Sequence, residues 1–336
     1  MKTKHILFLF LAPVSVLLTL FVTSSLWVVP APLIPDSGPF VYFMKPILTS
    51  LVYSLGVCVI ALLISDGIFV PFKGSNAKIA AQVSLGLSGV SFAAAVFTLA
   101  QALSQPLSLI ANLNVIATYG WDVANVRALL LIALISFISF LVLLKPNVDR
   151  VGLVAAINVI GLSLPALLSH GGGVSTHQWA VVSGFTHGVS IALWISGVIA
   201  IFLIVSNKDL TQDQKSLALH KFSFLAGFAV ISLIISGSIN SYTRLNSLIE
   251  IVSTTYGQLV IAKISLLISA LVVAINIRKR LQTEIKKLVG LEMGLLLFTL
   301  GISVVLASTA YPKTGAAAFT LIESITGYPE PVKFEL

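Results

Sequence analysis

Long apolar segments separated by short polar ones constrain this chain more than any other feature. Segments of about 20 residues, the length at which a helix crosses the hydrocarbon core of a bilayer, cover residues 6–28, 47–70, 79–104, 126–144, 151–169, 178–205, 217–240, 256–277 and 288–310. Only 10% of the residues are charged, whereas a soluble domain carries about 25%. We therefore predict an all-α fold, a polytopic integral membrane helical bundle of about nine transmembrane helices.

The positions of the basic residues predict an orientation for this bundle. Cytoplasmic loops of membrane proteins are enriched in Lys and Arg. With the N-terminus inside, most of the 20 basic residues fall on the cytoplasmic side, and the exceptions are Lys45, Arg127, Arg244, Lys263, Lys313 and Lys333. We expect a multi-pass protein of the inner (plasma) membrane with an N-in/C-out topology. The net charge of +8 is explained by this topology, so no nucleic-acid partner is expected.

The segments outside the main spans allow further expectations. The first apolar run follows Lys2 and Lys4 and resembles a signal peptide, but it exceeds the usual apolar region of about 7–15 residues, which favours a retained helix. Residues 29–46 are rich in proline and are predicted to form an extended outer linker. Residues 105–125 contain Tyr119 and Trp121, which suit an interfacial segment.

Several classes of function find no support in the sequence. The loops on the inner side are short, and no phosphate-binding glycine motif or strand pattern occurs, so this chain alone is not expected to use ATP. Cys58 is the only cysteine, which excludes an internal disulfide and Cys-based metal motifs. No nucleophile or acid–base constellation appears, so we expect no enzyme activity.

Three histidines at the outer side of the fifth and sixth spans are the candidate metal ligands. His170 ends the fifth span, a run of three glycines follows, and His177 opens the sixth span. His187 lies ten residues further along, about 15 Å deeper at 1.5 Å per residue. Imidazole is a common ligand of copper, zinc, iron and nickel.

Each histidine also has a purely structural explanation. His177 is next to Trp179 and fits an interfacial position, and His170 fits a solvated turn before the glycines. His187, near the bilayer midplane, fits a hydrogen bond to a Ser or Asn of a neighbouring helix.

Residues of the sixth, seventh and eighth spans are expected to line a cavity around these histidines: Trp194, Asn240, Tyr256 and Lys263. Polar groups inside a membrane are costly and often functional. For Lys263 the alternative is that its long side chain extends to the membrane surface. Glu292, near the inner end of the last span, is expected to pair with nearby lysines or with a neighbouring helix.

These segments carry a resemblance to a known family. The relevant stretches are SHGG, FTHGVSIALWISGVIAIFL, HKFSFLAGFAVISLIISGSINSY and TTYGQLVIAKISLLISALVVAINIRKR. Between His170 and Arg278 the chain resembles the copper resistance protein D family, with His187, Trp194 and Gly197 matching the family's histidine followed by a tryptophan–glycine step. The chain also resembles the N-terminal half of actinobacterial fusions of this domain with a caa3-type oxidase assembly domain.

The resemblance implies a division of the chain and a function. Residues 1–150 would form N-terminal scaffold helices, 151–287 a four-helix copper resistance D-like domain, and 288–336 the last helix with an external tail. The implied function is copper ion transport across the plasma membrane for uptake or resistance, with copper bound transiently by His170, His177 and His187. The implied partners are the lipid bilayer and an extracytoplasmic copper carrier.

Two alternatives remain open at this stage. His170 and His187 from adjacent helices are suitable axial ligands for haem b. The likeness to the fusion proteins suggests instead a non-catalytic role beside an oxidase assembly factor.

Overall fold

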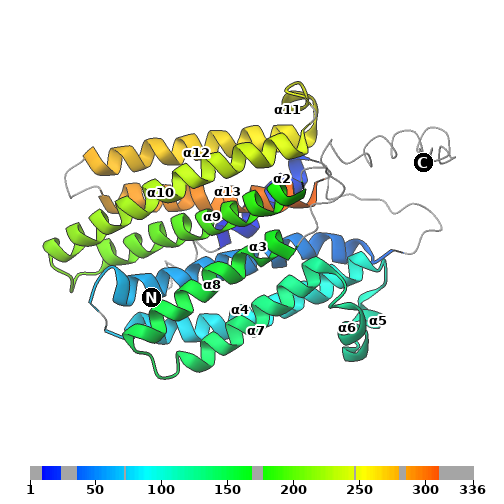
Figure 1. Ribbon diagram of the computed structural model, residues 1–336, viewed down its shortest axis with the longest axis horizontal. Coiled ribbons are helices and arrows are strands. Elements are labelled where there is room, and N and C mark those ends of the chain that lie inside the picture. The colour runs from blue at the N-terminus through cyan, green and yellow to red at the C-terminus, as the bar shows by residue number, and fades with distance from the viewer. Residues whose placement is uncertain are drawn as a thin grey trace.

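Long antiparallel helices run along the length of the molecule (Figure 1). The computed structural model describes residues 10–23, 36–71, 73–168, 177–245, 247–279 and 285–309. Its long helices are α3 (Pro39–Leu63), α4 (Ser75–Ala102), α7 (Ala124–Val142), α8 (Val148–Leu168), α9 (His177–Ser206), α10 (Gln212–Arg244), α12 (Thr255–Lys279) and α13 (Ile285–Ser308). The shorter ones are α2 (Leu11–Val22), the π-helix η2 (Ile64–Ile68), α5 (Leu107–Ile110), α6 (Leu113–Tyr119) and α11 (Glu250–Ser253).

The helices have the length and composition of membrane spans. Within the described residues, eight helices are long and apolar enough to cross a bilayer, and α2 is a shorter apolar helix of 12 residues. Large apolar side chains such as Phe224, Phe228, Ile268 and Val272 point outward from α10 and α12, as expected of surfaces that face lipid. The all-helical membrane fold predicted from the sequence is confirmed. About nine full spans were predicted; the described residues contain eight, together with the shorter helix α2.

The proline-rich segment differs from its prediction. Residues 39–46 were expected to be extended, but α3 begins at Pro39 and continues through Pro46. Proline is tolerated at the first position of a helix, where its missing N–H would have no partner. Inside membrane helices it is tolerated because neighbouring groups satisfy the freed backbone atoms. The prediction of an extended linker is therefore wrong for these residues, while 24–35 lie outside the described residues.

Helices α3 and α9 form the centre of the bundle. Helix α3 packs against α2, α4, α8, α9 and α13, and α9 packs against α3, α8, α10 and α13. In Figure 1 the helices α4, α7 and α8 lie on one side of this centre, and α10, α12 and α13 lie on the other. The polar residues of the candidate site lie on the side formed by α9, α10, α12 and α13.

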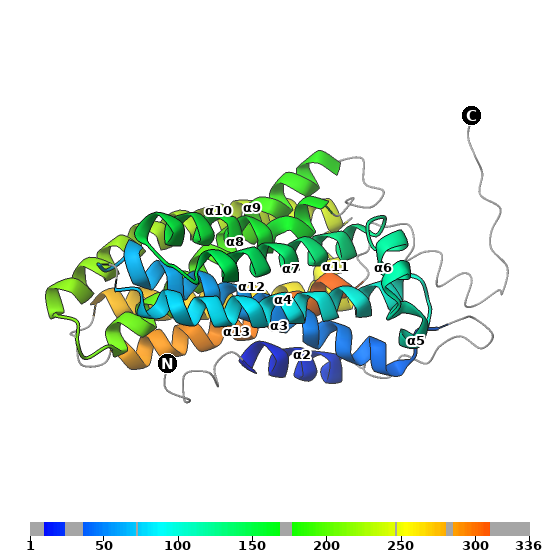
Figure 2. The ribbon, with the colours of Figure 1, turned by 90° about the horizontal axis from the view of Figure 1, so that it is seen from below.

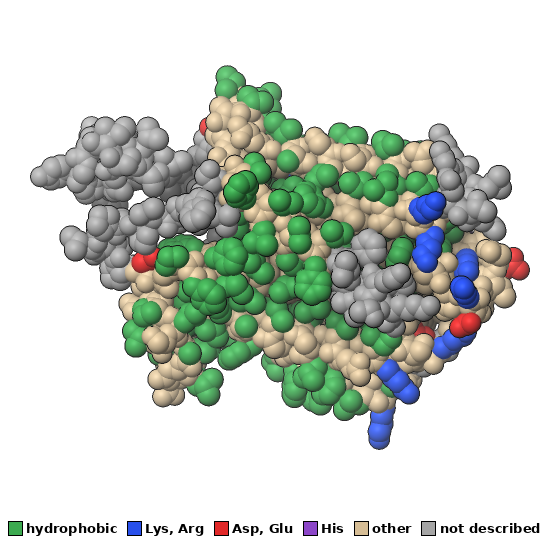
Figure 3. Space-filling model, turned by 180° about the vertical axis from the view of Figure 1, so that it is seen from behind, with side chains coloured by type: hydrophobic (Ala, Val, Ile, Leu, Met, Phe, Trp, Pro, Cys, Tyr) green, Lys and Arg blue, Asp and Glu red, His purple; other side chains and the backbone are tan. Residues whose placement is uncertain are grey.

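Basic side chains gather at one end of the bundle, which we call the basic end (Figure 3). The loops between α3 and α4, between α7 and α8, and between α9 and α10 lie there, as do the end of α12 and the start of α13 (Figure 1). Exposed residues on or beside these loops include Lys78, Arg150, Lys208 and Lys286. This arrangement agrees with the expectation that these loops share the cytoplasmic side.

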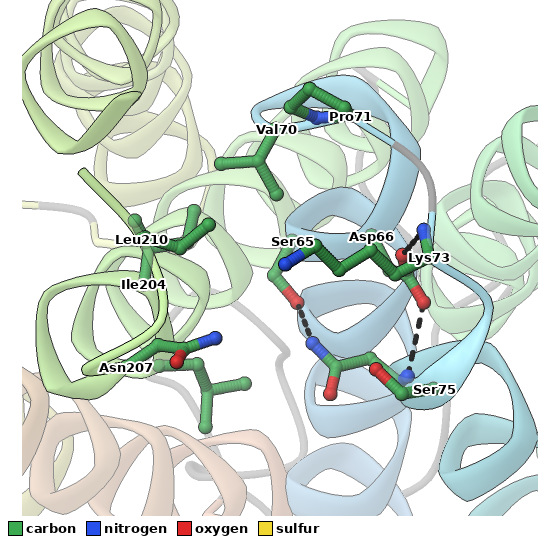
Figure 4. Close-up of a pocket in the computed structure, with 11 residues that line it drawn as sticks. Ser65, Asp66, Val70, Pro71, Lys73, Ser75, Ile204, Asn207 and Leu210 are labelled. Carbon is green, nitrogen blue, oxygen red and sulfur yellow. Dashed lines mark hydrogen bonds between the residues drawn. The ribbon is translucent and has the colours of Figure 1, made fainter. Parts of the chain in front are cut away.

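A buried carboxylate holds the turn between α3 and α4 at the basic end (Figure 4). Asp66 is 3% exposed and accepts hydrogen bonds from the backbone N–H groups of Lys73 at 2.8 Å, Gly74 at 3.2 Å, Asn76 at 3.0 Å and Ala77 at 3.2 Å. These bonds satisfy donors at the start of α4 that have no partner within the helix. Both carboxylate oxygens of Asp66 accept hydrogen bonds from the turn. The carboxylate in the wall of the adjoining pocket of about 50 Å³ therefore has a structural role.

The short helix α2 packs closely against α13 (Figure 2). Ser15 Oγ donates a hydrogen bond to the Phe298 carbonyl at 2.7 Å. At Gly301 an added Cβ would lie 2.4 Å from the Ala12 carbonyl oxygen, so this crossing requires a glycine. The expectation that the first helix is retained stays a prediction, but α2 forms part of the packed bundle.

The α2–α13 crossing gives a stability prediction. The Gly301→Ala substitution should lower the free energy of unfolding by about 1–3 kcal/mol, since an extra methyl group forces backbone apart. Gly294→Ala is the matched control, because its Cβ would lie 3.8 Å from Leu11 Cδ1, an ordinary contact. Thermal unfolding of the two variants in detergent measures the difference. Equal melting temperatures would contradict the close crossing.

Candidate functional site

A histidine in the middle of α9 joins three helices. His187 Nδ1 lies 3.1 Å from Ser236 Oγ on α10, and His187 Nε2 lies 3.3 Å from Lys263 Nζ on α12. The imidazole is only partly exposed. Both ring nitrogens therefore have partners from helices distant in sequence.

The hydrogen-bond network indicates which ring nitrogen carries the proton. The Ser236 hydroxyl has one hydrogen, and it donates to the Ser232 carbonyl at 2.6 Å. Ser236 Oγ is then the acceptor of the His187 Nδ1–H, which leaves a lone pair on Nε2. An ammonium group at Lys263 has only donors, so it donates to this lone pair.

Close helix packing places His187 in the interior of the bundle. Added Cβ atoms at Gly184 and Gly188 would lie 3.3 Å from Ala166 Cβ and 3.1 Å from Ser163 Oγ on α8, respectively. Such small residues allow helices to approach closely in a membrane. Gly184 and Gly188 therefore bring α8 close to the part of α9 that carries the histidine.

Polar pairs continue along the same face of α9 in both directions. Away from the basic end, Ser183 Oγ donates to Asn240 Oδ1 at 2.9 Å, and both residues are buried. Toward the basic end, Trp194 Nε1 donates to Glu292 Oε1 on α13 at 3.2 Å. Trp194 is 2% exposed and Glu292 is 3% exposed.

A cavity of about 270 Å³ adjoins the Trp194–Glu292 pair. Residues of α9, α10, α12 and α13 line it, and apart from Trp194, Ser223 and Glu292 they are aliphatic or aromatic residues and glycine. Of the residues predicted to line a cavity, Trp194 does so here. Asn240, Tyr256 and Lys263 lie outside this lining.

The predicted site residues fall into three groups. His187 and Lys263 are in contact, and the alternative in which Lys263 extends to the membrane surface is wrong, because its ammonium group reaches the imidazole. Tyr256 is buried near the start of α12. His170 lies outside the described residues, and His177 is the first residue of α9, with its side chain outside them.

The structure also shows contacts that were not predicted from the sequence. Glu292 pairs with a neighbouring helix, as one of its two alternatives proposed, but its partner Trp194 was not foreseen. The spacing of seven residues between His187 and Trp194 places both on one helix face but does not indicate a partner on α13. Asp66 was also missed, because a carboxylate at a span end looks like an ordinary boundary residue.

The described residues contain no group of three or more His, Cys, Asp or Glu side chains able to hold a metal ion. His187 thus offers one nitrogen ligand, already hydrogen-bonded to Lys263. The purely structural role considered for His187, a hydrogen bond to a serine of a neighbouring helix, is also present, because its Nδ1 contacts Ser236 Oγ. A bis-histidine haem site would need His170, which lies outside the described residues.

Comparison with known proteins points to one family. Residues 216–306 match the family described as copper resistance protein D. The copper transport protein CutJ of Bacillus subtilis (strain 168) is 30% identical over 173 residues, which cover 49% of this chain and 29% of that protein. No solved structure matches.

The matched region coincides with much of the site. It includes Ser236, Lys263 and Glu292, while His187 on α9 precedes it. The chain spans less than a third of the length of the curated relative. With its apolar helices, this chain is a multi-pass membrane protein, and its residues 216–306 are similar to the copper resistance protein D family.

Proposed function

We propose that this chain moves copper ions across the plasma membrane through the helices α9, α10, α12 and α13, with His187 as a transient ligand. One observation carries the proposal: the Nε2 lone pair of a membrane-embedded histidine is directed at a cation, the Lys263 ammonium 3.3 Å away. The family match and the name of the relative, a copper transport protein, support copper as the transported ion.

The position of Lys263 supports a displacement step. A copper ion bound to Nε2 at the usual metal–nitrogen distance of about 2 Å would occupy the space before the ammonium group. The ion and Lys263 would compete for one lone pair, and Lys263 would return as the ion leaves. Such competition keeps binding weak enough for release, which conduction requires.

Ser236 has a supporting role in this proposal. Its hydroxyl accepts the Nδ1–H and is itself tied to the Ser232 carbonyl. A partner on the second ring nitrogen fixes the orientation and tautomer of a metal-binding imidazole. The ring is thereby held with Nε2 toward the ion position.

The remaining sequence-based assignments extend the proposal toward the end opposite the basic end. His170 and His177 would receive the ion there from an extracytoplasmic copper carrier, and Asn240 and Tyr256 would shape the route. Residues 1–150 would act mainly as scaffold. Because α13 supplies Glu292, the transport unit would extend beyond the expected boundary at residue 287. The haem b and oxidase-assembly hypotheses have no specific support in the described residues.

The first prediction concerns His187. His187→Ala should abolish copper flux into liposomes that contain a trapped copper chelator, since the proposed transient ligand is removed. His187→Asn, which keeps a polar side chain near Ser236 but is a poor copper ligand, should also lose flux. Both should elute from gel filtration like the unmodified protein.

His220→Ala is the matched control for this assay, because His220 is exposed at the basic-end half of α10. It should transport copper at the unmodified rate. Flux by both His187 variants equal to that of the control would overturn the proposal.

The second prediction concerns Lys263. Lys263→Met removes the competing ammonium group, so copper should bind more tightly, roughly tenfold or more given about 1.5–3 kcal/mol for a charged hydrogen bond. Titration against a competing chelator measures the dissociation constant. Lys45→Met is the control, since Lys45 pairs with Gln101 between α3 and α4, away from the site. Unchanged or weaker binding in Lys263→Met would contradict displacement.

A further inference from the structure

An elongated apolar cavity lies between α10 and α12, in the half of the bundle nearer the basic end. Its volume is about 270 Å³, and α9 and α13 complete its walls. Helix α10 packs mainly against α9, and α12 packs mainly against α13 and α11, so direct packing does not close the space between α10 and α12. The cavity follows α10 from Leu219 to Ile231, about 18 Å at 1.5 Å per residue. This shape suits a chain better than a compact ligand.

The walls of the cavity favour a hydrocarbon occupant. Apart from Trp194, Ser223 and Glu292, the lining residues are aliphatic or aromatic residues and glycine. Trp194 and Glu292 are nearly fully buried and hydrogen-bonded to each other, so they present little polar surface to the cavity. An apolar cavity of about 150 Å³ stays dry and takes up a hydrocarbon such as benzene. The larger cavity here has room for a longer hydrocarbon segment.

The cavity opens on the surface that faces lipid. Ile231 on α10 and Ile275 on α12 line it, and their side chains are 61% and 51% exposed. Phe228 and Val272, on the same two helices, are exposed as well, as expected of surfaces in contact with the bilayer. An acyl chain of the bilayer can therefore enter the cavity sideways, between α10 and α12.

Basic side chains lie beyond the cavity, toward the basic end. On α10, Lys215 is four residues before the lining residue Leu219, and on α13, Lys286 is three residues before the lining residue Val289. Residues three or four apart share a helix face. Both helices begin at the basic end, and helical side chains tilt toward the start of their helix, so both ammonium groups are directed toward the lipid headgroups on that side. Basic pockets between membrane helices on the cytoplasmic side bind anionic headgroups.

We infer that this cavity binds one acyl chain of an anionic phospholipid from the cytoplasmic leaflet, and that Lys215 and Lys286 attract its phosphate group. The bound chain fills the space between α10 and α12 and thereby holds α12 in the bundle. Because α12 carries Lys263, the lipid supports the contact between Lys263 and His187. The lipid site does not depend on which ion is transported.

Trp194 in the cavity wall reports occupancy, because bromine atoms on a nearby acyl chain quench its fluorescence. The protein for this test carries Trp27→Phe, Trp121→Phe and Trp179→Phe and is reconstituted in phosphatidylcholine bilayers. Brominated phosphatidylglycerol should reach half-maximal quenching at a mole fraction about fivefold lower than brominated phosphatidylcholine, or lower still, given the attraction of a lysine for anionic lipid. Equal mole fractions for the two lipids would overturn the inference.

Gly227→Leu tests whether the cavity is the site of quenching. Gly227 lines the cavity, and an added Cβ there meets no atom within 4 Å, so the leucine side chain takes the space of the acyl chain. Half-maximal quenching should then require several-fold more brominated phosphatidylglycerol. Gly89→Leu on α4 is the matched control, since its added Cβ also meets open space, and it should leave quenching unchanged.

Gel filtration accompanies this comparison, and both glycine variants should elute as the starting protein does. Unchanged quenching in Gly227→Leu would overturn the inference. If Gly227→Leu also converts a dimer into a monomer while quenching stays the same, a second copy of the chain covers the cavity instead of a lipid.

The combination of Lys215→Gln and Lys286→Gln tests the headgroup contact. Brominated phosphatidylglycerol and brominated phosphatidylcholine should quench this double variant at equal mole fractions. The matched control combines Lys78→Gln and Lys145→Gln, two exposed lysines beside α4 and α7, and should keep the preference for the anionic lipid. An undiminished preference in the Lys215 and Lys286 double variant would contradict the assigned phosphate contact and overturn the inference.

Discussion

The contact between Lys263 and His187 links a peripheral helix to the centre of the bundle. Helix α12 otherwise packs mainly against α13 and α11, and much of its surface consists of exposed apolar side chains. The hydrocarbon core provides no water for an ammonium or imidazole group, so each must find a partner within the protein. The Lys263–His187–Ser236 chain meets this requirement across three helices and fixes which faces of α9, α10 and α12 turn toward one another.

The rest of the bundle supports this arrangement through packing. Helices α3 and α9 are the common centre; α4 and α8 pack against α3, and α7 packs against α4 and α8. Some of their buried polar groups pair with a neighbouring helix, as in Asn158 of α8, which donates to Ser139 Oγ of α7 and to the Val154 carbonyl. Asp66 likewise serves the start of α4. Under the proposed function, the polar groups that connect α9 with α10, α12 and α13 are the ones that would meet a passing ion.

Hydropathy predicted the long helices well because a membrane span is a local property of about 20 residues. The bounds of α7, α8, α9 and α12 lie within a few residues of the expected spans. The start of α3 was missed because proline is judged as a helix breaker from local sequence, whereas at the first helical position it is well tolerated.

The partner of a polar residue depends on which helices are neighbours and on how each helix is rotated about its axis. The periodicity of a single helix does not contain this information. The outward-facing alternative for Lys263 looked reasonable because its depth of about 10 Å permits a long side chain to reach the surface. The partner of Glu292 is 98 residues away in the chain and had no local signal. Ser236 and Asn240, by contrast, are four residues apart and so share one face of α10, and both contact α9.

The central claim is that His187 Nε2 becomes a copper ligand when the ion enters the bundle. X-ray absorption at the copper edge, on purified protein loaded with one equivalent of copper, measures the ligand shell directly. In a protein that carries His170→Ala and His177→Ala, which removes the other two proposed imidazole ligands, copper should show scattering from a bound imidazole. Adding His187→Ala should abolish this signal, whereas adding His220→Ala should not. An identical imidazole signal in His187→Ala would show that copper binds elsewhere and would contradict the claim.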